Sequence, residues 1–511
     1  MADEILVETT SGQIRGAMRQ GIAVFKGVPY AGSPQGGARF KAPAKTATWT
    51  GVRDCLDFGP RAIQSDDAIA LASSVAELFP ASERQTTSED CLILNVWTPA
   101  VEDGGDRPVM VWLHGGAFIA GSGASPWYEG TNLARKGDVV VVTLNHRLGA
   151  LGYLYLADLG GKEFADSGNV GMLDVVAALE WVRDNIATFG GDPDNVTLFG
   201  ESGGGAKISV LMAMPAAHGL FHKAIVQSGP AVEMMSRDNA TATARQMLGE
   251  LGLGANEIAK LRAVPADRLL AAQNAVLAKI CAMSFANRRR QGFNPVIDGV
   301  NLPGGPFAPD APALSAPVPL MIGTNRDEMN LFFGFAPWAE NLSEESMVAA
   351  AANFLGERAK AVVASYRRAR PQASPRDLVL AIATDQSMRM PSLTIADRKL
   401  AQHAAPVFVY LFTWATPVLD GKLGSCHALE IPFVFDNLAS SRLAGDVPAA
   451  LALADNMSRS WIEFAHKGDP NHSGVPYWPA YSAQERPTMI FDIECRIEND
   501  PYRVERMAWD A

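Results

Sequence analysis

A nucleophilic serine is the first chemistry that the sequence suggests. The segment Gly200-Glu201-Ser202-Gly203-Gly204 has the pattern G-x-S-x-G, and the apolar residues 196–199 lead into it. In a strand–turn–helix elbow of this kind, glycines admit a strained backbone that lifts the serine hydroxyl above a sheet. We therefore predict that Ser202 is a nucleophile. The alternative interpretation is a glycine-rich tight turn with no chemical role.

A second glycine-rich segment could stabilise the charge that such a reaction creates. The apolar residues 109–113 run directly into His114-Gly115-Gly116-Ala117. Small residues after a buried strand let backbone N–H groups approach a tetrahedral oxyanion, and one donor of this kind lowers the barrier by ~3 kcal/mol. Gly116 and Ala117 are predicted to donate from this loop, and Gly203 from just after the nucleophile.

The general base can be selected by elimination among eight histidines. Catalytic groups lie at the carboxyl ends of parallel strands, and after a nucleophile of this type the acid and then the histidine follow along the chain. Only His427 follows a core-strand pattern, at residues 407–412, on that side of the sheet. A neutral imidazole must accept the serine proton, so activity should rise with an apparent pKa of about 6 to 7.

The acid that orients the histidine should follow an earlier strand. Residues 320–322 are apolar and lead to Asp327 and Glu328. A carboxylate there would fix the imidazole tautomer and stabilise the imidazolium that forms when Ser202 loses its proton. Spacing alone does not choose between the two neighbouring carboxylates.

These side chains need a large, mostly parallel sheet to hold them. Alternating patterns typical of antiparallel strands lie at 5–9, 13–17 and 22–26. Apolar runs typical of buried parallel strands lie at 109–113, 139–144, 196–199, 224–226, 320–322, 407–412 and 489–491. A helical period covers 173–189. The alternation predicts one α/β domain over 1–511 with helices on both faces of the sheet, and two helix-rich cap insertions at 231–317 and 329–400.

Charge and composition argue against several classes of function. The net charge of −11 disfavours binding to nucleic acid or to anionic membranes. No apolar run reaches about 18 residues, and the first residues do not read as a signal peptide. Five widely spaced cysteines favour a reducing, cytoplasmic compartment. His218 and His222 are four residues apart but lack the glutamate of a zinc motif, so neither a metal nor a cofactor is expected.

Many ordered blocks of the chain resemble the type-B carboxylesterase family, which includes cholinesterases and bacterial para-nitrobenzyl-type esterases. Beyond the segments already described, the blocks are Phe25-Lys26-Gly27-Val28-Pro29-Tyr30-Ala31, Ser88-Glu89-Asp90-Cys91-Leu92, Asn145-His146-Arg147-Leu148-Gly149, Gly168-Asn169-Val170-Gly171-Met172-Leu173-Asp174, Leu220-Phe221-His222-Lys223-Ala224, Asn294-Pro295-Val296-Ile297-Asp298-Gly299 and Glu430-Ile431-Pro432-Phe433. They cover nearly the whole chain, which makes the resemblance specific.

The resemblance implies an α/β-hydrolase fold and hydrolysis of carboxylic esters through an acyl-enzyme intermediate. It assigns the role of acid to Glu328, the second carboxylate of its pair. It also implies that Ser228 and Glu430 lie near the triad, and that Arg39 forms an ion pair with Glu89.

The sequence departs from the family pattern at a few positions. Gly203 stands where alanine is usual, which keeps the N–H donor but loosens the elbow. Met329 stands where glycine is common after the acid. The family often pairs the cysteine at Cys91 with one in the preceding loop, but the expected position here is Ala62, so no disulfide is expected.

A small-molecule ester is the expected partner, and the chain is expected to be a monomer or a weak homodimer. Proximity to the motifs suggests an apolar substrate pocket lined by Phe118, Met234, Met235, Leu331 and Phe332. Three alternatives stay open. The same triad could hydrolyse amides, carbamates or lactones. A non-catalytic binding relative and a lipase are further alternatives, although every triad residue is present and no apolar lid helix is evident.

Overall fold

A central sheet of 13 strands organises the part of the chain described by the computed structural model, which is residues 4–69, 71–80, 86–281 and 291–510. The strand order is β1-β2-β3-β5-β7-β6-β8-β9-β12-β13-β14-β15, with β4 paired to β2. The strands are β1 (Glu4–Thr9), β2 (Gly12–Arg19), β3 (Ile22–Pro29), β4 (Val52–Asp54), β5 (Ile93–Thr98), β6 (Arg107–Leu113), β7 (Val140–Leu144), β8 (Gly191–Glu201), β9 (Lys223–Gln227), β12 (Leu320–Asn325), β13 (Val407–Phe412), β14 (Pro487–Phe491) and β15 (Arg496–Asn499).

The middle of this sheet is parallel and its edges are antiparallel. Every neighbouring pair from β7 through β6, β8, β9, β12 and β13 to β14 is parallel. The first strands form an antiparallel meander that joins the centre through β5, and β15 closes the other edge antiparallel to β14. The predicted mostly parallel sheet is confirmed. Strands β4, β5 and β15 were not predicted, and β4 and β15 are short and largely exposed.

Side chains alternate across the sheet and bury a separate hydrophobic core on each face. Along β6, Val109 and Val111 pack into the core that contains helix α5 (Val170–Asn185), whereas Met110 and Trp112 pack into the core that contains α17 (Ala450–Lys467). This period of two is the geometry of a strand buried on both faces. The predicted helix at 173–189 is α5 followed by a short 3-10 turn, and Gly190 ends it with φ 71°.

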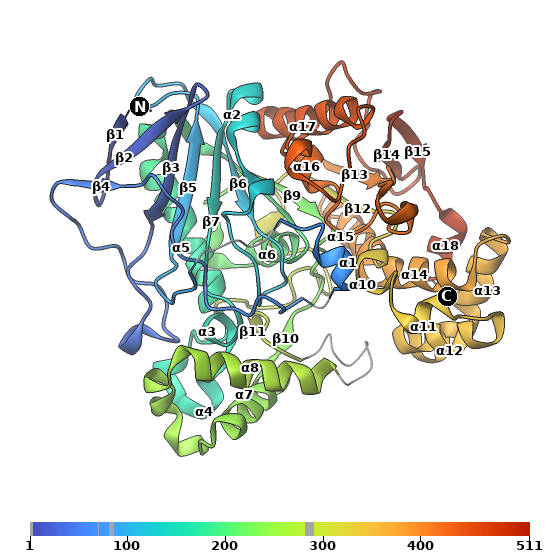
Figure 1. The fold of residues 1–511 in the computed structure, drawn as a ribbon, viewed down its shortest axis with the longest axis horizontal. Coiled ribbons are helices and arrows are strands. Elements are labelled where there is room, and N and C mark those ends of the chain that lie inside the picture. Colours follow the sequence, from blue (N-terminus) through green and yellow to red (C-terminus); the bar gives the residue numbers. More distant parts are fainter. Residues whose placement is uncertain (1–3, 70, 81–85, 282–290, 511) are drawn as a thin grey trace.

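Helices cover both faces and form two further groups away from the sheet (Figure 1). One group contains α7 (Arg237–Leu251) and α8 (Ala266–Cys281), which pack on each other. The other group contains α12 (Glu344–Leu355), α13 (Ala359–Ala369) and α14 (Pro375–Thr384). These groups lie within the predicted insertions, part of the first of which (282–290) falls outside the described residues. The remaining α-helices are α1 (Ser73–Ala76), α2 (Thr131–Gly137), α3 (Gly149–Tyr153), α4 (Ala157–Gly160), α6 (Gly203–Leu211), α10 (Asn330–Phe333), α11 (Pro337–Glu340), α15 (Met390–Leu400), α16 (Ile431–Val434) and α18 (Arg503–Met507).

The two insertions also contain elements that the sequence did not predict. Strands β10 (Met235–Ser236) and β11 (Val296–Ile297) form a small parallel pair within the first. At the end of the second, α15 packs against β12 and β13, so this helix is part of the layer that covers the sheet. Among the described helices, none is both long and apolar enough to cross a bilayer.

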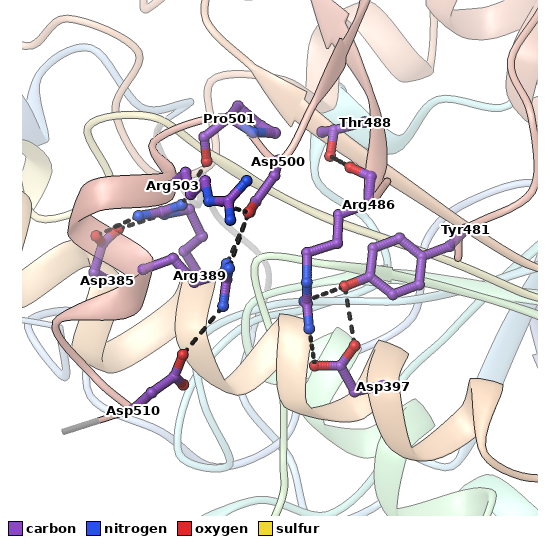
Figure 2. A network of polar contacts seen from close by, with 11 residues as sticks. Asp385, Arg389, Asp397, Tyr481, Arg486, Thr488, Asp500, Pro501, Arg503 and Asp510 are labelled. Carbon is purple, nitrogen blue, oxygen red and sulfur yellow. Dashed lines mark hydrogen bonds and ion pairs between the residues drawn. The ribbon is translucent and has the colours of Figure 1, made fainter. Parts of the chain in front are cut away.

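Ion pairs join segments that are far apart in the sequence. Near the C-terminus, Arg486 lies 3.1 Å from Asp397 of α15, and the Tyr481 hydroxyl donates to the same carboxylate at 3.0 Å (Figure 2). Near the N-terminus, the Arg39 guanidinium donates to both carboxylate oxygens of Glu89, with a distance of 2.6 Å from Nε to Oε2. The ion pair expected between these last two residues is confirmed.

Candidate active site

Ser202 lies at a sharp turn between the central strand β8 and helix α6. Its backbone has φ 54° and ψ −119°, a conformation that residues with a side chain rarely adopt. Its N–H donates to the carbonyl oxygen of Gln227 at 2.8 Å. An ideal Cβ on Gly204 would lie only 1.8 Å from the carbonyl oxygen of Leu113, so α6 can begin this close to β6 only with glycine there. The structure therefore contains the strand–turn–helix elbow that the motif predicts.

His427 contacts two carboxylates from different parts of the chain. Its Nδ1 lies 2.6 Å from Oε2 of Glu328, which follows β12. Its Nε2 lies 3.1 Å from Oε1 of Glu201, the last residue of β8. Both Ser202 and His427 are described, and no hydrogen bond joins the serine hydroxyl to the imidazole. Catalytic hydrogen bonds often form fully only once substrate is bound, so this geometry is compatible with a serine–histidine pair.

Asp327 and Glu328 lie in the turn that follows β12, and their side chains have different partners. Glu328 is fully buried, and its Oε1 accepts a hydrogen bond from the backbone N–H of Asn325 at 2.7 Å. Asp327 is half-buried and accepts from the backbone N–H of Ser425 at 2.9 Å and from Nε of Arg326 at 3.0 Å. Glu328 therefore faces the imidazole, and Asp327 ties down the loop that carries it.

The environment of His427 is strongly negative. Burial alone would lower the pKa of His427, but the charges of Glu201 and Glu328 outweigh burial and raise it to about 9. Burial raises the pKa of Glu201 well above its ordinary value, although the nearby imidazole opposes this, and Glu430 and Glu328 add to the rise. The pKa of Glu430 is also raised, first by burial and then by Glu328. Three buried carboxylates thus hold a proton on or near the imidazole.

A chain of hydrogen bonds holds Glu430 behind the catalytic groups. Its carboxylate accepts from Nδ2 of Asn325 at 2.7 Å and from Nε2 of Gln227 at 3.1 Å. The Gln227 side chain in turn accepts from Nε1 of Trp461, on α17, at 2.9 Å. Ser228 is buried beside this chain, but its hydroxyl has no hydrogen-bond partner among the described residues. Glu430 is thus fixed near the histidine, whereas Ser228 has no such contact.

The loop after β6 presents free backbone donors. Gly116 and Ala117 both have positive φ, 84° and 52° respectively. No described residue accepts a hydrogen bond from the N–H of either residue. Such unused donors are available to an incoming oxyanion. Gly203, the third predicted donor, is the first residue of α6 and lies directly against Ala117.

The residues predicted to line a substrate pocket lie in different places. The ring centroid of Phe332 is 5.2 Å from that of His427. Met234 and Met235 line a cavity of about 1230 Å³ that Asp397 and Arg486 also border. Phe118 and Leu331 are buried in the two cores, with the Phe118 ring edge-on to Tyr153. Neither Ser202 nor His427 is among the described residues that line this cavity, so the pocket residues stay predictions.

Several residues of the site were missed in the sequence. Glu201 fills a variable position of the G-x-S-x-G pattern, and its place next to the nucleophile was the available signal. No signal in the sequence pointed to Gln227, Asn325 or Trp461. Their hydrogen bonds join residues more than a hundred positions apart: Gln227 and Asn325 donate to Glu430, and Trp461 donates to Gln227.

The chain is similar to known proteins along its whole length. Residues 3–509 match the model of the Carboxylesterase family. The chain is 39% identical to the para-nitrobenzyl esterase of Bacillus subtilis, over 98% of this chain and 97% of that protein. It is 34% identical to the phenmedipham hydrolase of Pseudarthrobacter oxydans, over 96% and 95% of the two chains. A crystal structure of a carboxylesterase from Geobacillus stearothermophilus superimposes with a TM-score of 0.85 at 39% identity, covering 99% of each chain. A structure of a para-nitrobenzyl esterase also superimposes with a TM-score of 0.85, at 38% identity. The two similarities confirm the predicted α/β-hydrolase fold.

Proposed function

Because this chain belongs to the carboxylesterase family and is a carboxylic-ester hydrolase, we propose that Ser202, His427 and Glu328 carry its reaction. The observation that supports this most is the 2.6 Å contact between Nδ1 of His427 and Oε2 of Glu328. It accompanies the strained strand–turn–helix conformation at Ser202. A carboxylate in that place fixes the tautomer whose Nε2 can accept a proton.

The reaction proceeds in two acyl-transfer steps. Neutral His427 takes the proton of Ser202 as the hydroxyl oxygen attacks the ester carbonyl, and the oxyanion is bound by the N–H groups of Gly116, Ala117 and Gly203. The imidazolium then protonates the leaving alcohol, and the acyl group stays on the serine oxygen. Water, deprotonated by His427, then attacks the acyl-enzyme ester, and the acid is released as the imidazolium returns its proton to the Ser202 oxygen. The charge of the buried Glu430 carboxylate also favours the imidazolium form of His427.

The substrate is a small-molecule ester, and the two helical groups shape access to it. We propose that apolar side chains contact this substrate. Phe332 lies next to His427. Met234 and Met235 line the large cavity. The compartment is proposed to be the cytoplasm, because the five cysteines are widely spaced and the buried Cys55 and Cys91 lie in the reduced form. Cell fractionation with an antibody against the protein tests this location.

A labelling experiment tests the nucleophile and a substrate panel tests the reaction. A fluorophosphonate should add one adduct to the wild-type protein, on the peptide that contains Ser202, and none to Ser202→Ala. Ser209→Ala is the matched control, since Ser209 lies on the same helix and donates within it to the carbonyl of Gly205. Turnover of p-nitrophenyl esters should exceed that of matched anilides and carbamates. An adduct on another residue, or preference for the anilide or carbamate, would contradict the proposal.

A further inference from the structure

Lys207 is a fully buried lysine directly behind the oxyanion loop. It lies on α6, five residues after the nucleophile. Its ammonium donates to the carbonyl oxygen of Ala117 at 2.8 Å and to that of His114 at 3.1 Å. These two carbonyls stand at the two ends of the four-residue loop 114–117, which carries the free N–H groups of Gly116 and Ala117. No described carboxylate lies within ion-pair distance of Lys207, and its N–H groups are directed at the loop itself.

Three rings lie near Lys207, those of His114, His146 and Phe118, and none of them carries a charge. The rings of His114 and His146 stack with centroids 5.1 Å apart, and burial followed by the lysine charge lowers the pKa of both. These histidines are therefore neutral. The ammonium also lies 5.2 Å from the centroid of the Phe118 ring. Burial lowers the pKa of Lys207 to about 7, and the nearby charge of Glu201 opposes that fall.

Gly203 and Lys207 act on the same peptide of the loop. They are four residues apart on α6 and so lie on one face of the helix. An ideal Cβ on Gly203 would lie 2.2 Å from the carbonyl oxygen of Ala117 and 2.6 Å from its nitrogen. Because Gly203 has no side chain, the backbone of Ala117 can pack directly against α6. This packing brings the carbonyl oxygen of Ala117 within hydrogen-bond distance of Lys207.

We propose that Lys207 is a positioning residue for ester hydrolysis, which fastens the oxyanion loop to α6 by donating to two of its carbonyls. This inference rests on the proposed function. Ala117 needs such support, because its positive φ is unfavourable for a residue with a side chain. Gly203 completes the arrangement by leaving room for the loop.

The test compares Lys207→Met with Lys399→Met. Lys399 is the matched control: it is also fully buried and also donates to two backbone carbonyls, those of Ser315 and Ala316, before the amino end of β12 and away from the catalytic loops. With p-nitrophenyl acetate, Lys207→Met should lower kcat by about 10- to 100-fold and change KM by less than about threefold. Its affinity for a trifluoromethyl ketone, which forms a negatively charged tetrahedral adduct, should fall by the same factor as kcat/KM. Lys399→Met should lower thermal stability but leave kcat and the ketone affinity near wild type.

Two more variants keep the test decisive. Lys207→Gln, whose amide can still donate, should recover part of the kcat that Lys207→Met loses. Gly203→Ala should lower kcat with little change in KM, and its effect should be less than additive with that of Lys207→Met, because both displace Ala117. All of these variants should still react slowly with the fluorophosphonate at Ser202, which separates this inference from the proposed nucleophile. The inference is overturned if Lys207→Met keeps more than half of the wild-type kcat or loses no more ketone affinity than Lys399→Met. Should Lys207→Met fail to fold, an undiminished kcat in Gly203→Ala overturns it.

Discussion

Nε2 of His427 lies 3.1 Å from the carboxylate of Glu201, the residue that directly precedes the nucleophile. The imidazole is therefore held between two acids, Glu201 at one nitrogen and Glu328 at the other. In this resting arrangement a protonated imidazole is favoured, while the reaction needs a neutral one. The two requirements oppose each other, and pH decides between them.

The first prediction concerns that pH dependence. Only the neutral form of His427 can accept a proton, and its pKa is raised to about 9, so kcat/KM should rise through pH 7 and 8 toward about pH 9. The sequence-based expectation of about 6 to 7 included Glu328 but took no account of the second adjacent carboxylate, Glu201. Glu201→Gln removes one of them and should shift the midpoint toward the ordinary imidazole value of about 6.5. Profiles of kcat/KM from pH 5 to 10 measure both proteins.

Glu430→Gln is the control for this shift. Glu430 also raises the pKa of His427, but less than Glu201 and Glu328 do, so the midpoint should move in the same direction by less. Identical midpoints in the wild type and Glu201→Gln would show that Glu201 does not act on the titrating group.

The two neighbouring carboxylates should separate catalysis from stability. Glu328→Gln should lower kcat by up to ~10⁴-fold with little change in the thermal midpoint, because the imidazole loses the group that orients it. Asp327→Asn should leave most of kcat but lower the free energy of unfolding by about 1 to 2 kcal/mol, because its bonds to Ser425 and Arg326 weaken. If Glu328→Gln keeps more than about a tenth of the wild-type kcat, another group orients His427.

Removal of the indole donor on α17 should act mainly on stability. Trp461→Phe leaves the side-chain amide oxygen of Gln227 buried without its partner, which should cost about 1 to 3 kcal/mol in urea denaturation beyond the packing loss. Trp112→Phe is the matched control, because Trp112 is equally buried but its Nε1 has no hydrogen-bond partner among the described residues. Equal losses in the two variants would mean that the bond to Gln227 contributes nothing.

The buried hydroxyl of Ser228 should be dispensable. It has no partner in the described part of the chain, so Ser228→Ala removes a buried polar group that makes no hydrogen bond. We expect a thermal midpoint equal to or above that of the wild type and a kcat within about threefold. A larger fall in kcat would restore the role that the family resemblance implied for this residue.

The sequence predicted the parts of this protein that depend on local patterns. The elbow at Ser202 and the strands of the parallel centre could be read from short runs of residues, because two-sided burial and tight turns restrict which residues can stand there. The choice of Glu328 over Asp327 needed the family resemblance, since both follow the same strand. Contacts such as Trp461 to Gln227, or Lys207 to Ala117, depend on how distant segments pack, and no local pattern records them.

The hydrogen bond from Trp461 to Gln227 also bears on how the protein is made. Ser202 emerges from the ribosome early, but its partners are encoded later: Glu328 and His427 follow, and the indole that holds Gln227 comes at position 461. At about 5–20 residues per second, roughly 10 to 50 seconds of synthesis separate the nucleophile from the last of these residues. During that interval the segment around Ser202 lacks groups that hold it in its strained conformation. A nascent chain is thus inert at least until His427 has been made, and the appearance of activity reports the folding of the segments from Ser202 to His427.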